Sequence, residues 1–301
     1  MKVRVRVPAT SANLGPGFDA LGLALALYNE VVAEEADRVT VVAEGEGAGR
    51  LATGERNVVA RGVRAAYDAV GRPFKGCRLT CVNRIPLARG LGSSAAAWVG
   101  GLLAGNALLG SPLEPPALLA LAARAEGHPD NVAAAIFGDL TVSCSAPEGA
   151  WAVSLAVPAR LRWVPLIPEV SSSTAEARAV LPASVPRTDA VFNVQRVALL
   201  LAGLQADRPE ALRVAFDDRL HQPYRLRLFP WMSQVAEAAR QAGALGCVLS
   251  GAGPSLLAIV ADAAADAVAR AMEEALGRAG VAGKAGVVDV DRHGATTALV
   301  A

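Results

Sequence analysis

The stretch IPLARGLGSSAAAWVGGLLAGNALLG, which runs from Ile85 to Gly110, joins a glycine-rich loop to a long apolar run. It contains no charged residue after Arg89, so it has to be weighed as a membrane span, a buried helix or a phosphate-binding loop. A spanning helix needs about 20 predominantly apolar residues. Here Gly101 and Asn106, among others, interrupt the apolar part. The pattern therefore favours a helix buried in the core of a globular protein.

The front of this stretch has the composition of a phosphate-binding loop. Residues 90–94, GLGSS, are followed at once by AAAWV, which is a helix start. Small residues let a backbone approach a ligand closely, and the first N–H groups of a helix point outward without partners. We expect Ser93 or Ser94 to cap the helix and one of the two hydroxyls to reach a metal ion. The stretch is not a Walker loop, because no Lys-Ser or Lys-Thr pair follows the last glycine.

The composition is that of a globular protein. Of the 301 residues 53% are hydrophobic and 19% are charged, which suits one large core or two medium ones and excludes a disordered chain. The formal net charge is +1, which gives no indication of nucleic acid as a partner. The only lysines are Lys2, Lys75 and Lys284, so an anion site in this chain has to use arginine or backbone N–H groups.

The amino terminus and the cysteines indicate a cytoplasmic protein. MKVRVRVPA alternates charged and apolar residues like a strand and lacks the apolar core of a secretory signal. Cys77 and Cys81 lie in GCRLTCVN, which also alternates, so we expect both to pack on one strand face together with Leu79. No cysteine–histidine spacing fits a zinc site.

A tight turn near the amino terminus brings two polar residues together. In SANLGPGFDALG, Asn13 and Asp19 flank the turn Gly15-Pro16-Gly17. A capped turn leading into a strand would account for both residues. Alternatively, the turn directs both side chains into a pocket, where the carboxylate suits the ammonium group of a substrate.

Glu126 occupies an unfavourable place for a carboxylate. In LAARAEGHPDNV it ends an apolar helix directly before Gly127, which is a helix-stop signal. A negative charge at a helix C-terminus opposes the helix dipole, and a bound Mg²⁺ ion would remove that penalty. The alternative is a solvated surface glutamate. His128, Asp130 and Asn131 follow, either as a simple turn or as part of a site.

Four loop motifs occur along the chain, each beside an apolar segment. They are PATSANLGPGFDALG from Pro8, PLARGLGSSAA from Pro86, AEGHPDNVAAAIFGDL from Ala125 and LSGAGPSLLAIV from Leu249. Together, and in this order, they resemble the signature motifs of the GHMP small-molecule kinases, most closely of the members that phosphorylate homoserine. The resemblance covers residues 7 to about 260, and four separated motifs make it specific.

The resemblance implies two α+β domains with the active site between them. It also implies the ATP-dependent, Mg²⁺-requiring phosphorylation of the L-homoserine side-chain hydroxyl to O-phospho-L-homoserine, a step towards threonine. Two positions depart from the family pattern: Ala134 stands where the family usually has proline, and Asp139 where it commonly has a second glycine. Asp139 lies beyond the polar residues of its motif, so the expected chemistry is unchanged.

The resemblance assigns the residues that bind the amino acid. It places Asn13 and Asp19 at the amino-acid end of homoserine, with His128 lining the same pocket. The substrate carboxylate needs cations, and the family pattern selects Arg178 and Arg225 among the arginines of the chain. Arginine is suited to this task because its guanidinium group forms bidentate pairs with carboxylates.

The resemblance also assigns the residues of phosphoryl transfer, a reaction that depends mostly on positioning and charge neutralisation. Asn131 would orient the homoserine hydroxyl, and Ser94 and Glu126 would contact the metal ion; we expect all three to be catalytic. No general base is singled out, and the phosphate itself is an alternative proton acceptor. The residues expected to bind ATP are Asn57, Pro86, Leu87, Ala88, Arg89, Gly90, Leu91, Gly92, Ser93, Ser94, Ala95, Ala96, Ser250, Gly251 and Gly253.

The coarse pattern of elements predicts an α+β fold. Strands and helices mix without a regular βαβ repeat, and we expect an N-terminal domain over residues 1–157 and a C-terminal domain over residues 158–301. The proline-bearing residues 158–169 are expected to lead into the second half. Helices are expected over 57–70, 191–204, 209–216, 231–242 and 263–279, and strands over parts of 1–45, over 77–83, over 142–157 and within 246–260.

Two other functions stay open at this point. One is another kinase of the same family, acting on mevalonate, a sugar or a shikimate-like acid; because those substrates lack an ammonium group, Asp19 with Arg178 and Arg225 favours an amino acid. The other is a non-catalytic ligand sensor of the same fold, against which Ser94 and Glu126 argue. The expected partners are ATP and L-homoserine, without nucleic acid or membrane, and a homodimer is left open.

Overall fold

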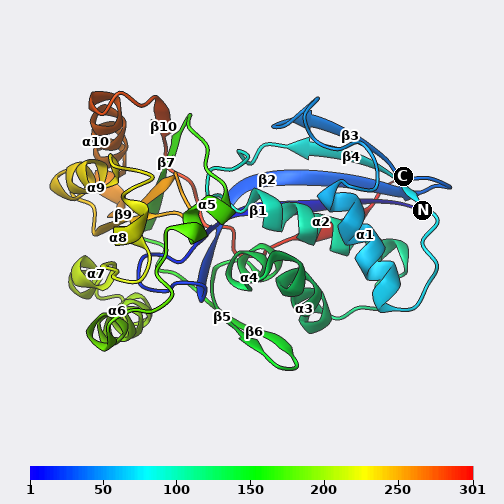
Figure 1. Cartoon of the computed structure of the whole chain (residues 1–301), viewed down its shortest axis with the longest axis horizontal. Coiled ribbons are helices and arrows are strands. Elements are labelled where there is room, and N and C mark those ends of the chain that lie inside the picture. The colour runs from blue at the N-terminus through cyan, green and yellow to red at the C-terminus, as the bar shows by residue number, and fades with distance from the viewer. Residues whose placement is uncertain (301) are drawn as a thin grey trace.

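A seven-stranded sheet forms one half of the molecule (Figure 1). The structure is a computed structural model that describes residues 1–300. The strands of this sheet are β1 (Lys2–Ala12), β2 (Leu21–Glu35), β3 (Thr40–Gly45), β4 (Cys77–Asn83), β5 (Leu140–Ala146), β6 (Gly149–Leu155) and β11 (Thr296–Leu299). Their order is β11-β1-β2-β4-β3, with β5 paired to β2 and β6 paired to β5. β3 and β4 are parallel, whereas the long pair of β1 and β2 is antiparallel.

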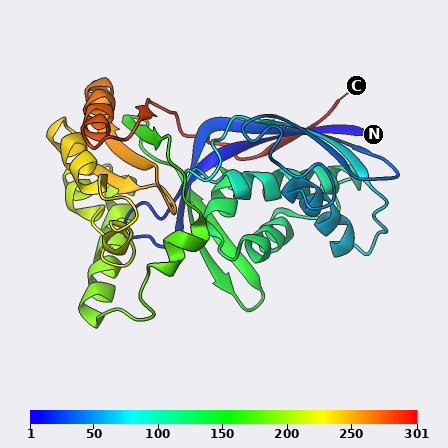
Figure 2. The same ribbon diagram turned by 45° about the horizontal axis from the view of Figure 1, so that its top comes forward.

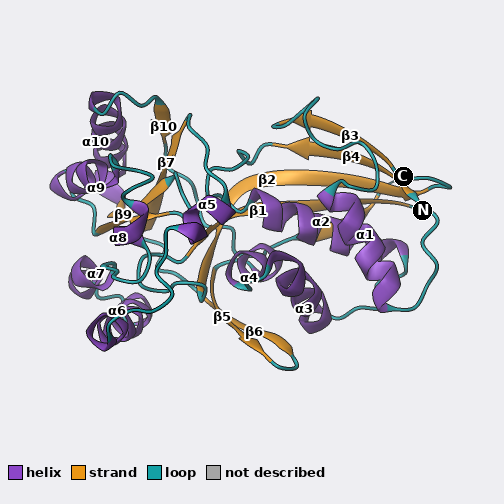
Figure 3. Ribbon diagram, in the orientation of Figure 1, coloured by secondary structure: helices purple, strands orange, loops and turns teal. Residues whose placement is uncertain are grey.

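Four helices cover one face of this sheet (Figure 3). They are α1 (Val58–Ala69), α2 (Ser93–Leu108), α3 (Pro115–Glu126) and α4 (Asp130–Phe137). α2 contacts β1 and β2 on one side and α1 and α3 on others, so it is buried on nearly all sides. A helix in that position has no face for charged side chains, which explains its charge-free sequence. Within residues 1–300, no helix has both the length and the apolar character that crossing a bilayer requires.

A four-stranded antiparallel sheet forms the other half. Its strands are β7 (Leu161–Pro168), β8 (Gly246–Leu249), β9 (Leu256–Ala261) and β10 (Gly283–Ala285), in the order β10-β7-β9-β8. Leu256 and Val164 pack with α9 (Met232–Gln241) and α10 (Ala265–Arg278) on one face. Ile259 and Trp163 face the opposite way, towards α6 (Arg187–Gln205) and α7 (Pro209–Ala215). The sheet is therefore covered on both faces, and the predicted α+β class is confirmed.

The predicted strand face of β4 is confirmed, since Cys77, Leu79 and Cys81 are all buried in the first core. Residues 142–157 are mostly strand, as predicted, and form most of the hairpin of β5 and β6. Another element prediction is wrong. Most of residues 158–169 form β7 rather than a connection. Pro165 is tolerated there because its carbonyl and its missing N–H face Gly286, just beyond the end of β10.

The last strand of the described chain returns to the first sheet. β11 pairs with β1 in antiparallel register, and Figures 1 and 2 show both termini at the same end of the molecule. The residues before β11 also join the first half, because Asp291 accepts a hydrogen bond from the hydroxyl of Tyr28 at 2.8 Å. The division into domains at residues 157 and 158 stays a prediction.

Asp139, which stands where the family commonly has a second glycine, has a backbone conformation that favours glycine. Asp139 has a positive φ of 54°, which glycine adopts most easily and aspartate tolerates better than most residues. Its carboxylate also pairs with Arg292 at 3.1 Å. The departure from the family pattern therefore keeps the backbone conformation and adds an ion pair to the segment that leads to β11.

α1 and α2 approach each other closely because glycines face each other where they cross. A Cβ atom added at Gly101 would overlap the carbonyl oxygen of Val59 and crowd the Cα atom of Gly62. Gly62 in turn lies against the backbone of α2. Because α2 carries the glycine-rich loop at its N-terminus, this contact helps to fix where that loop lies.

Gly101→Ala is expected to lower the free energy of unfolding by roughly 1–3 kcal/mol, because the added methyl group has to displace backbone of α1. Alanine is otherwise the better helix former by up to about 1 kcal/mol. Gly277→Ala in α10 is the matched control, since a Cβ atom there meets nothing within 4 Å; it should be neutral or stabilising. Urea unfolding checks both variants, and equal gains in stability would contradict the close contact.

Candidate active site

One cavity of about 430 Å³ collects residues from both halves of the molecule. The end of β1, the glycine-rich loop, the end of α3, the start of α4 and α5 (Thr174–Ala179) contribute to it, as do α8 (Gln222–Arg225) and residues 251–253. All the sequence-predicted site residues line this cavity except Ala96 and Ser250. Ala96 is buried inside α2, and the Ser250 hydroxyl is bonded to Gly90 O and Ser11 Oγ. Residues distant in sequence are thus brought together as the motifs predict.

The glycine-rich loop, residues 86–92, lines the cavity next to the start of α2. Gly90 and Gly92 have φ values of 74° and 69°, and a Cβ atom at Gly92 would overlap the hydroxyl of Thr10. The predicted capping by Ser93 or Ser94 is wrong: Gly92 is the N-cap residue, and no side chain caps α2. Both serines already lie inside the first turn, where their hydroxyls cannot occupy the capping position. The first amides of α2 are therefore left for a ligand.

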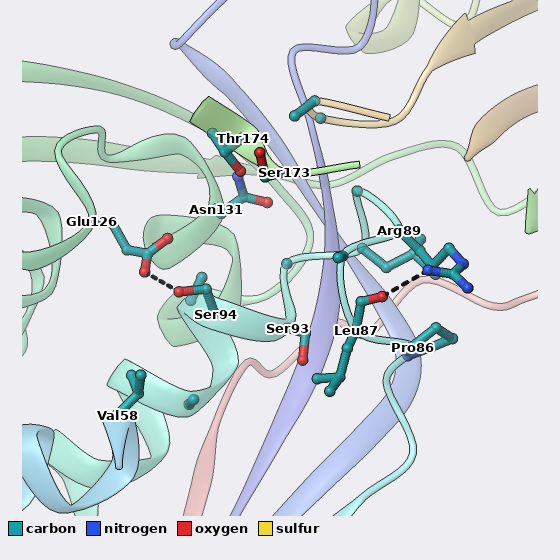
Figure 4. Close-up of a pocket in the computed structure, with 18 of the residues that line it drawn as sticks. Val58, Pro86, Leu87, Arg89, Ser93, Ser94, Glu126, Asn131, Ser173 and Thr174 are labelled. Atoms are coloured by element: carbon teal, nitrogen blue, oxygen red, sulfur yellow. Dashed lines mark hydrogen bonds between the residues drawn. The ribbon is translucent and has the colours of Figure 1, made fainter. Parts of the chain in front are cut away.

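Ser94 and Glu126 lie side by side in the cavity (Figure 4). The Ser94 hydroxyl donates to Glu126 Oε1 at 2.5 Å. Gly127 ends α3 with a φ of 87°, which confirms the predicted helix end and leaves Glu126 on the last turn. Burial raises the pKa of the Glu126 carboxyl, while the bond from Ser94 acts against that rise. The Ser94 hydroxyl oxygen and a carboxylate oxygen of Glu126 thus lie next to each other beside the glycine-rich loop.

Arg89 holds the loop rather than pointing its charge at the cavity. Its guanidinium group donates to the carbonyl oxygens of Pro168 and Glu169, at 2.8 and 2.5 Å, and to that of Leu87 at 3.1 Å. These bonds join the glycine-rich loop to the end of β7. The backbone therefore supplies most of the loop's capacity to bind an anion.

Asn131 and His128 are each oriented by a neighbour. The hydroxyl of Thr10 donates to Asn131 Oδ1 at 2.8 Å, which fixes the side-chain amide of Asn131. Asp130, which is buried, lies with Oδ1 2.6 Å from His128 Nδ1. That bond is the main reason why the pKa of His128 is raised, and burial opposes it. Thr10 is therefore a functional candidate that the sequence did not single out, and Asp130, to which the sequence assigned no role, orients His128.

Asp19 and Arg178 pair with each other across the cavity. Arg178 donates to both carboxylate oxygens of Asp19, at 2.6 and 3.1 Å, and these bonds raise the pKa of Arg178. Asn13 positions Asp19, because its Oδ1 accepts the Asp19 backbone N–H at 3.0 Å. Asn13 Nδ2 donates to the carbonyl of Gly251 at 2.9 Å. One positive and one negative group thus lie together at one end of the cavity.

Arg225 is a buried cation held by neutral acceptors. Its Nε donates to Ala177 O at 3.1 Å, and its Nη1 donates to Gly251 O at 3.1 Å and to His221 Nδ1 at 2.9 Å. Burial lowers the pKa of Arg225 to about 10, so the group is still charged at neutral pH. Because Arg225 lines the cavity, its charge is available to an anionic ligand.

Comparison with known proteins places the chain among phosphotransferases. The GHMP kinase N-terminal domain matches residues 57–139, and the GHMP kinase C-terminal domain matches residues 200–278. The homoserine kinase of Moorella thermoacetica is 49% identical over 254 residues, covering 84% of this chain and 86% of that protein. The homoserine kinase of Persephonella marina is 42% identical over 301 residues and covers 100% of both chains.

Solved structures agree in fold. The crystal structure of homoserine kinase from Cytophaga hutchinsonii has a TM-score of 0.90 and 32% sequence identity, and the match covers 99% of this chain and 97% of that one. The crystal structure of L. major mevalonate kinase has a TM-score of 0.69 at 14% identity, which indicates a shared fold only.

His221 provides a test of the site's electrostatics by pH. Burial lowers the pKa of its imidazole to about 4, and Arg225 acts in the same direction while Asp218 and Asp19 oppose it. Between pH 6.5 and about 4 the unfolded chain therefore binds a proton that the folded chain does not, so stability falls as pH falls. His221→Asn lacks this contribution. From pH 7.5 to pH 5, the free energy of unfolding of the wild type should therefore fall relative to that of His221→Asn by on the order of 1 kcal/mol. Urea unfolding at both pH values checks this, and a constant difference would contradict it.

Proposed function

The chain belongs to the homoserine kinases of the GHMP family, and we propose that its cavity positions ATP and L-homoserine for transfer of the terminal phosphoryl group to the homoserine hydroxyl. The observation that carries the proposal is the charge pattern of the cavity. Free helix amides lie at one end, and Asp19 with Arg178 and Arg225 lies at the other. The product is O-phospho-L-homoserine, and its formation is a step towards threonine.

The amino-acid end of the site fits a zwitterion. Asp19 and Arg178 neutralise each other at 2.6 Å, and a substrate with one ammonium and one carboxylate group can bond to both without leaving either charge unpaired. Arg225 supplies a second cation, so the carboxylate is met by two arginines and the ammonium by Asp19. Asn13 holds Asp19 in place and His128 lines the same end.

The phosphate end of the site fits ATP and a hard cation. GHMP kinases use ATP, and the loop from Pro86 to Gly92, with the first amides of α2, would receive its phosphates. Ser94 and Glu126 supply a hydroxyl and a carboxylate oxygen, which are the ligand types that Mg²⁺ prefers. Bound there, the metal ion would neutralise phosphate charge.

Positioning of the reacting hydroxyl falls to Asn131. Because Oδ1 of Asn131 accepts from Thr10, its Nδ2 group is the part that can contact the substrate hydroxyl. The nearby carboxylates of Asp19 and Asp130 are already bonded to Arg178 and His128. We therefore propose that the hydroxyl proton passes to a phosphate oxygen, and that the protein acts through alignment and charge.

Glu126→Gln should reduce kcat at least about hundredfold, a loss typical of removing one preorganised charged group. It should also weaken activation by Mg²⁺, because an amide is a poorer ligand than a carboxylate. The fold should be retained, since Gln can still accept from Ser94. Glu274→Gln, on the exposed side of α10, is the control and should behave like wild type. Full activity of Glu126→Gln at limiting Mg²⁺ would remove Glu126 from the metal site.

The substrate class is tested by removing one charged group at a time. Homoserine should exceed both 3-aminopropan-1-ol, which lacks the carboxylate, and 4-hydroxybutyrate, which lacks the ammonium, by about 10⁴-fold in kcat/KM, because either analogue lacks one of the two charged groups that the site is built to bond. Asp19→Ala should impair homoserine more than 4-hydroxybutyrate. Arg225→Ala should impair homoserine more than 3-aminopropan-1-ol. Equal losses of kcat/KM for all three compounds in both variants would contradict the assignment of an amino acid as the substrate.

A further inference from the structure

His221 lies beneath the amino-acid end of the cavity and is completely buried. Its Nε2 atom is 2.8 Å from the carbonyl oxygen of Gly15, and its Nδ1 atom is 2.9 Å from Arg225 Nη1. A carbonyl only accepts and a guanidinium only donates. The partners therefore determine the tautomer: Nε2 carries the proton and Nδ1 accepts from Arg225.

The surroundings of His221 leave its ring little freedom. Asp218 Oδ2 accepts the backbone N–H groups of His221 and Gln222, at 3.1 and 2.7 Å, which fixes the start of α8. Phe18 stacks on the imidazole with 5.1 Å between the ring centres. Phe18 directly precedes Asp19. The His221 imidazole therefore contacts the Gly15–Asp19 turn twice, through the stacked Phe18 ring and through the bond from its Nε2–H group to Gly15.

His221 thus joins two parts of the site that come from opposite halves of the molecule. On one side is the turn from Gly15 to Asp19, and on the other is the guanidinium group of Arg225. The bonds to His221 and to the Gly251 carbonyl occupy Nη1 of Arg225, and the Ala177 carbonyl occupies Nε. Nη2 takes part in none of these bonds, so the orientation that His221 helps to impose decides where this nitrogen points.

We propose that His221 is a positioning residue for substrate recognition: as the neutral Nε2–H tautomer it fixes the Arg225 guanidinium relative to the turn that carries Asp19. The spacing of the two charged ends of an amino-acid substrate is then matched by the spacing of Asp19 and Arg225. This inference rests on the proposed binding of the homoserine carboxylate by Arg225. Burial, which lowers the pKa of His221 to about 4, supports a neutral ring at physiological pH.

Two conservative variants separate the two bonds of His221. In His221→Gln the amide nitrogen can replace Nε2 and keep the bond to Gly15, but the acceptor for Arg225 is lost. In His221→Asn the amide oxygen can replace Nδ1 and keep the bond from Arg225, but the donor to Gly15 is lost. Gln222→Leu is the matched control, because it removes a bond to the Leu249 N–H group at 2.7 Å next to His221 without touching Arg225.

The measured quantity is the ratio of kcat/KM for homoserine to kcat/KM for 3-aminopropan-1-ol. His221→Gln should lower this ratio about tenfold or more, the value of one bond to a charged group, whereas KM for ATP stays unchanged. His221→Asn keeps the bond from Arg225 but cuts the link to the turn, so it should also lower the ratio, by about threefold to tenfold, whereas Gln222→Leu should keep the wild-type ratio. An unchanged ratio in His221→Gln, or an equal fall in all three variants, would overturn the proposal.

A measurement on the wild-type protein covers the case in which a variant does not fold. NMR of protein labelled with ¹⁵N in its histidine rings should show His221 with a protonated Nε2 and an unprotonated Nδ1 at pH 7. A protonated Nδ1 or an imidazolium would overturn the positioning role. Failure of the wild type to phosphorylate homoserine would instead overturn the proposed function, whatever the state of this ring.

Discussion

The carbonyl oxygen of Gly251 is the point at which the two halves of the site meet. It accepts a hydrogen bond from Asn13, at the end of the first strand, and another from Arg225 in α8. The Gly251 N–H group donates to Ala12 at 3.0 Å. Asp19 is positioned by Asn13, and Arg178 is bonded to Asp19, so the positions of Asn13, Asp19, Arg178 and Arg225 all depend on the backbone of Gly251.

The charges of the site are arranged so that each is compensated within the protein. Asp19 and Arg178 pair directly, Asp130 pairs with His128, and Arg225 is bonded to neutral acceptors. Burying a charge without such partners would cost several kcal/mol. A binding site with compensated charges can keep a fixed shape, and a substrate that offers the same two charges exchanges one set of bonds for another.

Much of this could be predicted from the sequence because the motifs are local. The glycine-rich loop, the helix end at Glu126 and the turn before Asp19 are each encoded within a few residues, and the structure contains all three. The bonds of Arg89 to the end of β7 could not be predicted, since an arginine in an anion-binding loop is expected to face the ligand. The role of Thr10 also depends on a contact across 121 positions of sequence.

The pairing of β11 with β1 has a consequence for how the chain is made. A ribosome releases β1 and β2 long before β11, and the edge of β1 that does not face β2 keeps free N–H and C=O groups until residues 296–299 have been made. Exposed strand edges are sites where chains associate wrongly. The alternating arginines of β1, Arg4 and Arg6, put positive charge on that strand throughout synthesis. Charge on an open strand edge discourages pairing with other chains.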